Sequence, residues 1–80
     1  MGRVYVLIDT ESGKASAIAE ALRKRPGVAL VDTVAGPHDV IAVLEEMRSG
    51  EIASTTVNEI RALTGVKYVT VCTGIRGIQS

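Results

Sequence analysis

A tight reversal at the centre of the chain constrains the fold more than any other feature. The segment Gly36-Pro37-His38-Asp39 separates two β-branched runs, residues 28–35 and 40–46. Because the connection is short, the two runs are expected to pair as an antiparallel hairpin. Glycine permits a positive φ and proline fixes the turn. The sequence therefore predicts a hairpin in the middle of the domain.

Two further apolar, β-branched runs, residues 3–9 and 66–73, predict strands at the ends of the chain. Between the strands, two segments carry apolar residues at helical spacing. The first has Ser12 as its expected N-cap, and the apolar face comprises Ala15, Ile18, Ala19 and Leu22. The second starts near residue 50 with Ser49 as a possible cap, and its face comprises Ile52, Ala53, Val57, Ile60 and Leu63. Pro26-Gly27 and Gly65 are expected to end these helices.

The predicted order is strand, helix, strand, strand, helix, strand. Right-handed crossovers then place the first and third strands in the middle of the sheet and both helices on one face. This is the ferredoxin-like α+β sandwich, with a four-stranded antiparallel sheet. We expect residues 1–80 to form a single domain.

The strands are apolar on both faces, although two helices can cover only one. An uncovered apolar face loses about 25 cal/mol for each Å² left in water, so a second subunit is expected to cover it. A chain of 80 residues also has a small core, which favours association. The sequence predicts a sheet-face homodimer whose interface includes Tyr5, Leu7, Ile41, Val43, Val69 and Val71.

Composition argues against several classes of function. Nine basic and nine acidic side chains balance, so the broad positive surface of a nucleic-acid-binding protein is not expected. No apolar run approaches the ~20 residues that cross a bilayer. Met1 leads directly into a strand-like segment without a signal peptide, and Cys72 has no partner for a disulfide. These features predict a cytoplasmic protein with no membrane partner.

Catalytic and metal-binding signals are weak. Ser12-Gly13-Lys14 resembles the end of a phosphate-binding loop, but Ile8 stands where the first glycine is required. His38 is the one histidine, and consecutive residues such as His38 and Asp39 seldom ligate the same metal. The sequence therefore predicts no metal, no cofactor and no enzymatic activity.

The central turn has a different kind of chemistry. Backbone N–H groups around Gly36 and the Asp39 carboxylate could bind the two charged ends of a zwitterion. That chemistry suits a free amino acid. The alternative is a simple hairpin turn in which Asp39 satisfies local N–H groups.

The order of these motifs resembles the effector-binding (RAM) domain of Lrp/AsnC-type transcriptional regulators. The matching parts are Ser12-Gly13-Lys14, Pro26-Gly27-Val28, the Gly-x-x-Asp turn Gly36 to Asp39, and Gly65-Val66. The resemblance implies sheet-to-sheet dimers that assemble into larger, octamer-like rings and bind amino acids near subunit interfaces. It assigns effector binding to Val34, Ala35, Gly36, Pro37, His38, Asp39, Thr55, Val69 and Val71.

Two departures from the family pattern matter. Only Met1 and Gly2 precede Arg3, so the usual helix-turn-helix domain is not expected, and action on DNA would require full-length Lrp/AsnC regulators as partners. Val69 and Val71 replace the family's Thr-x-Thr, which favours an apolar ligand side chain or no ligand at all. The second and fourth strands are also expected at opposite edges, ~14 Å apart, so a site using both would combine neighbouring subunits.

Three functions therefore stay open at the level of sequence. The first is an amino-acid-sensing domain that transmits occupancy through its oligomer. The second is a ligand-free oligomerisation module. The third is a small dimeric ferredoxin-like enzyme, such as a cofactor-free monooxygenase, which the low aromatic content of 2% and the single histidine disfavour.

Overall fold

The computed structural model describes residues 2–46 and 51–73 of the chain. Strands and helices follow one another in the predicted order. They are β1 (Gly2–Thr10), α1 (Ala15–Arg23), β2 (Val28–Thr33), β3 (Val40–Glu46), α2 (Glu51–Arg61) and β4 (Val66–Thr73).

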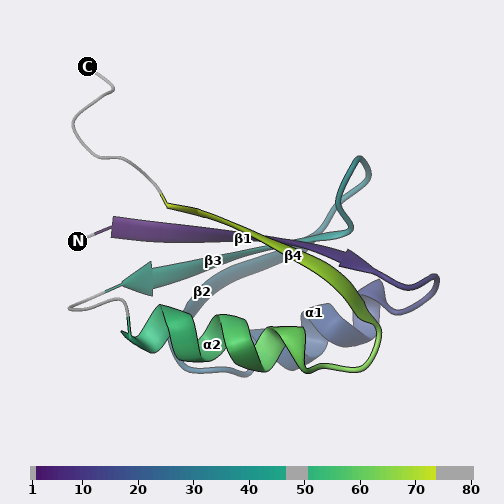
Figure 1. Cartoon of the computed structure of the whole chain (residues 1–80). Helices are drawn as coiled ribbons and strands as arrows, with labels where there is room; N and C mark the ends of the chain where they lie inside the picture. Colours follow the sequence, from purple (N-terminus) through teal and green to yellow (C-terminus); the bar gives the residue numbers. More distant parts are fainter. Residues whose placement is uncertain (1, 47–50, 74–80) are drawn as a thin grey trace, which may run out of the picture.

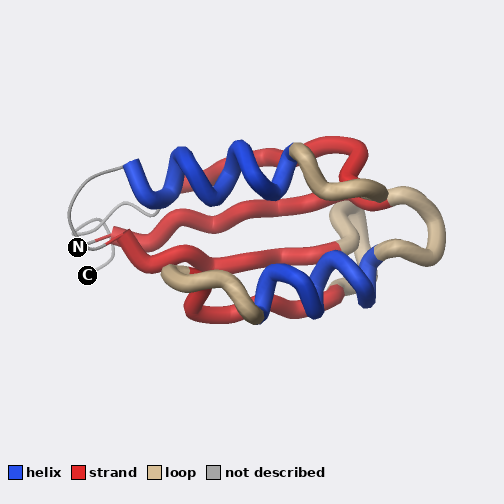
Figure 2. Tube along the Cα trace, turned by 90° about the horizontal axis from the view of Figure 1, so that it is seen from below, coloured by secondary structure: helices blue, strands red, loops and turns tan. Residues whose placement is uncertain are grey.

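The four strands form one antiparallel sheet in the order β2-β3-β1-β4. Both helices cover the same face of this sheet, and the other face is open (Figure 1). Seen from the helix side, α1 and α2 run along the strands, one over each half of the sheet (Figure 2). The predicted ferredoxin-like α+β fold, with β1 and β3 in the middle, is confirmed.

The core lies between the sheet and the helices. Alternate residues of β1 point into it, and α1 and α2 each contribute one apolar face, as the helical spacing predicts. Its most deeply buried side chains are Val6, Ile8, Leu22, Val40 and Ile60. Complete burial of a side chain of this size contributes about 1.5–3 kcal/mol, so these residues hold the layers together.

The start of α1 differs from the prediction. The helix begins at Ala15, with Lys14 at the N-cap position and no capping side chain, so the expected Ser12 cap is wrong. Gly13 has a φ of +80°, and the Lys14 N–H donates to the Glu11 carbonyl at 3.0 Å. This turn delays the helix and leaves Ser12 in the preceding loop. The expected Ser49 cap of α2 lies outside the described residues.

A glycine at a positive φ joins α2 to β4. Gly65 has a φ of +98°, and its carbonyl accepts from the Glu11 N–H at 2.7 Å. A Cβ at this position would lie 2.9 Å from the Cγ of Lys14, so glycine is needed for space as well as for conformation. The hydrogen bond between Glu11 and Gly65 therefore links the loop after β1 to the loop before β4.

The open face is apolar, as predicted, but two of the residues assigned to it lie on the other face of the sheet. Tyr5 and Leu7 lie on it with their β3 partners Val43 and Ile41. Val69 and Val71 do not, because they pair with Ile8 and Val6, which point into the core. Antiparallel partners share a face of the sheet, so the β4 residues on the open face are Tyr68, Thr70 and Cys72.

Neither helix has the length or apolar composition needed to cross a membrane, within the residues that the structure describes.

Candidate ligand-binding site

The connection between β2 and β3, residues 34–39, is called here the hairpin loop. It stands at the end of the sheet where β1 ends and β4 begins, and it rises away from the helices (Figure 1). The Val34 N–H donates to the Asp39 carbonyl at 2.9 Å and closes the loop. Gly36 has a φ of +153°, but a Cβ there would meet nothing within 4 Å. Glycine is therefore needed at this position for conformation rather than for space.

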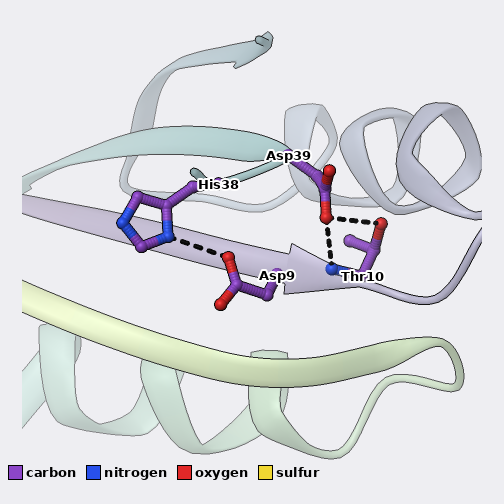
Figure 3. A network of polar contacts seen from close by, with 4 residues as sticks. All are labelled: Asp9, Thr10, His38 and Asp39. Atoms are coloured by element: carbon purple, nitrogen blue, oxygen red, sulfur yellow. Dashed lines mark hydrogen bonds and ion pairs between the residues drawn. The ribbon is translucent and has the colours of Figure 1, made fainter. Parts of the chain in front are cut away.

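The hairpin loop folds back onto the end of β1. The Asp39 N–H donates to the Ile8 carbonyl at 2.9 Å. The Oδ2 atom of Asp39 accepts from the Thr10 N–H at 2.8 Å and from the Thr10 hydroxyl at 3.3 Å (Figure 3). Asp39 thus binds a partner 29 residues away on β1, rather than N–H groups of its own turn.

A second polar contact joins the same two segments. The imidazole Nδ1 of His38 donates to the Asp9 Oδ1 at 2.8 Å, and the two side chains point toward one another (Figure 3). Each side chain is 29% exposed. Because a carboxylate only accepts, Nδ1 carries the proton in this contact. Sequence analysis missed the pair, because it weighed His38 only with its neighbour Asp39.

Three backbone donors of the hairpin loop are free to bind a ligand. Within the described residues, the N–H groups of Ala35, Gly36 and His38 have no intrachain acceptor, and Pro37 has no N–H. Ala35 and Gly36 are exposed. The loop therefore carries N–H donors without an intrachain acceptor in the same segment as the Asp39 carboxylate.

An open depression of about 650 Å³ lies at the start of β4. We call it the β4 depression; its lining includes Asp9, Arg61, Lys67, Tyr68, Val69 and Thr70. Asp9 belongs both to this depression and to the contact with His38. None of residues 34–39 lines the depression, and Asp9 connects it to the hairpin loop. Of these residues, sequence analysis assigned only Val69 to ligand binding, because nothing in the pattern of β4 or α2 brings Arg61 and Lys67 together.

Two other residues assigned from the sequence lie elsewhere. Thr55 is an exposed residue of α2, six positions before Arg61, which is about 9 Å along a helix axis. Val71 pairs with Val6 and does not line the β4 depression. The β4 depression thus includes Val69, but not Thr55 or Val71.

The loop and β4 are closer than the strand order suggests. β2 and β4 do occupy opposite edges of the sheet. However, His38 and Asp39 contact β1, which is the direct neighbour of β4, and Asp9 pairs with Tyr68. β1 and β4 are one strand spacing apart, about 4.8 Å. The expectation that a site using both the loop and Val69 combines two subunits stays a prediction.

Within the described ranges, no group of three or more His, Cys, Asp or Glu side chains is placed to hold a metal ion. The polar chemistry of this end of the sheet is that of hydrogen bonds and charge pairs.

Comparison with known proteins shows that the fold is shared with several solved structures. No protein-family model and no curated protein matches the chain. Among solved structures, TTHA0845 from Thermus thermophilus is 28% identical, with a TM-score of 0.84 and 96% of each chain covered.

Transcription regulators share the same fold. PF0864 from Pyrococcus furiosus, a transcriptional regulatory protein of the AsnC family, has a TM-score of 0.72 at 16% identity, over 98% of this chain and 55% of that one. This chain therefore shares its fold with a domain of these regulators. The regulator NMB0573 from Neisseria meningitidis, in complex with L-Met, has a TM-score of 0.75 at 14% identity, over 99% and 53% of the chains. The chain thus spans about half the length of these regulators.

Proposed function

We propose that this RAM-like domain is a non-enzymatic amino-acid sensor that self-assembles and modulates transcription through full-length Lrp/AsnC regulators. The observation that carries the proposal is the set of free loop N–H groups beside two carboxylates and the β4 depression. The complex of the similar regulator NMB0573 with L-Met supports the ligand class. In this proposal the domain acts in the cytoplasm and does not bind DNA itself.

The hairpin loop supplies the recognition chemistry. The α-carboxylate of the ligand accepts from the N–H groups of Ala35, Gly36 and His38. Its ammonium group donates to carboxylate oxygens of Asp39 or Asp9, each of which uses one oxygen in the contacts of Figure 3. Hydrogen bonds to charged groups contribute about 1.5–3 kcal/mol each, so a few of them suffice for millimolar affinity.

Assembly uses the open face of the sheet. A cross-sheet row of Leu30, Val43, Tyr5 and Cys72 runs over all four strands, and Leu30 is 52% exposed. Leu7 and Ile41 form the next row. A second copy of the domain that covers these rows removes their apolar area from water. We propose a sheet-face homodimer that assembles further into an octamer-like ring.

The second candidate function is a ligand-free oligomerisation module. The same apolar face favours it, since that face needs a partner whether or not the hairpin loop binds a ligand. Light scattering of mixtures with a full-length regulator separates the two functions. A module changes the mass of the regulator complex without added amino acid, whereas a sensor requires the amino acid for its full effect.

Screening of the standard amino acids by thermal shift and calorimetry tests the sensor directly. At least one amino acid is expected to raise the melting temperature, because a ligand that binds only the folded state stabilises it. If no amino acid gives a response at millimolar concentration, the ligand proposal is wrong and the module remains.

A further inference from the structure

The β4 depression has an unbalanced charge. It contains two cations, Arg61 and Lys67, and one carboxylate, Asp9. That carboxylate already accepts a hydrogen bond from His38. Within the described part of the chain neither cation forms an ion pair, whereas Arg23 pairs with Glu20 and Arg25 pairs with Glu59.

The position of these cations relative to the hairpin loop matters more than their number. Asp9 links the two features, since it lines the depression and holds His38 of the loop. An amino acid whose main-chain groups bind the loop would therefore extend its side chain along Asp9 toward β4. Arg61 and Lys67 line the depression that this side chain would enter.

We infer that the β4 depression receives a carboxylate, so that the effector is an amino acid with an acidic side chain. This inference rests on the proposed function and names its ligand class. Arg61 presents a planar guanidinium that can hold a carboxylate by two hydrogen bonds, and Lys67 adds a second positive charge. Hydroxyl groups of Tyr68 and Thr70 lie on the same lining.

An apolar ligand side chain is the alternative that Val69 and Val71 favour in the sequence. Val71 lies outside the depression, which removes half of that argument. Val69 remains, and Val66 also lines the depression, but the other five lining residues are charged or bear a hydroxyl group.

Isothermal titration with matched ligand pairs tests the inference. L-glutamate against L-glutamine, and L-aspartate against L-asparagine, differ only in the charged side-chain group. The acid is expected to bind about tenfold more tightly than its amide, which corresponds to one or two charged hydrogen bonds. Added salt should reduce this ratio, because the cations are exposed.

Substitutions of the two cations test whether the depression causes the preference for the acid over its amide. Arg61→Gln and Lys67→Gln should each bring the acid-to-amide ratio close to one while binding of the amide persists. Lys24→Gln is the matched control, since it removes one exposed positive charge at the end of α1, outside the depression. It should leave the ratio unchanged. Circular dichroism confirms that each variant is folded.

The outcomes separate this inference from the proposed function. If amino acids bind but the amides bind as well as the acids, the acidic ligand class is wrong and the sensor stands. If the preference for the acid survives both Arg61→Gln and Lys67→Gln, the depression does not receive the carboxylate and the inference is wrong, although the sensor stands. If none of the standard amino acids binds, both are wrong.

Discussion

The two carboxylate oxygens of Asp39 have different roles. Its Oδ2 atom holds Thr10 and therefore positions the hairpin loop on β1. Within the described residues its other oxygen has no hydrogen-bond donor, and we propose that it faces the ligand's ammonium group. A carboxylate in this position is thus both a structural clamp and a recognition group.

Substitution of Asp39 should change both the stability of the domain and its affinity for the ligand. Asp39→Ala should lower the free energy of unfolding by about 1 kcal/mol, because the Thr10 N–H loses its acceptor, and should abolish the ligand response with the dimer retained. Asp39→Asn keeps an oxygen for Thr10 but loses the charge, so stability should largely survive while ligand affinity falls. Urea denaturation and calorimetry measure the two effects. Unchanged ligand binding in both variants would disprove the recognition role.

Gly65 and Gly13 offer a matched pair of glycines at positive φ. Alanine at either position should cost about 1 kcal/mol in backbone strain. Only at Gly65 would the new Cβ meet a neighbour, Lys14, whose Cγ would lie 2.9 Å away. Gly65→Ala should therefore destabilise the domain by at least about 1 kcal/mol more than Gly13→Ala, as measured by urea unfolding. Equal losses would show that the loops at this end shift freely.

Residue types alone indicated the central parts of the site but not its contacts. Gly36 and Asp39 stand out because a glycine that permits a positive φ and a carboxylate in the same short hairpin are typical of a ligand-binding turn. Their partners Thr10 and Asp9 could not be identified, since these contacts depend on how far the loop folds over β1. Arg61 and Lys67 meet at the depression only because α2 returns to the sheet beside β4.

Elements with strong periodicity were predictable almost to the residue. The expected strands at 40–46 and 66–73 match β3 and β4, because apolar runs bounded by turn residues leave little freedom. The start of α1 was not predictable, because Gly13 forms a turn that competes with the Ser12 cap. The face of Val69 and Val71 was also misassigned, since both faces of the strands are apolar and only the pairing register decides between them.

The open face of the sheet gives a prediction at the scale of elements. Leu30 is half exposed on edge strand β2, so Leu30→Lys should leave the fold intact but place a charge in the proposed interface. We expect a shift toward monomer in sedimentation equilibrium, with unchanged circular dichroism. Ala21→Lys, at an exposed position of α1, is the control and should keep the assembly. A dimer that survives Leu30→Lys would mean that another surface forms it.

At the scale of the whole molecule, a small domain carries two separable surfaces. The open face of the sheet is suited to association, and the end of the sheet formed by the hairpin loop and the start of β4 is suited to a ligand. Because His38 and Asp39 contact β1, we propose that one chain can supply the whole ligand site. Assembly is therefore expected to tune binding rather than to create it.

The central claim is that the hairpin loop and the β4 depression form one ligand site. Titration of the ¹⁵N-labelled domain with amino acids, followed by amide chemical shifts, tests it most directly. The account predicts saturable shifts concentrated in residues 34–39, at Asp9 and Thr10, and in residues 67–70. Shifts confined to another surface, such as the outer side of α1, or no shifts with any standard amino acid, would contradict it.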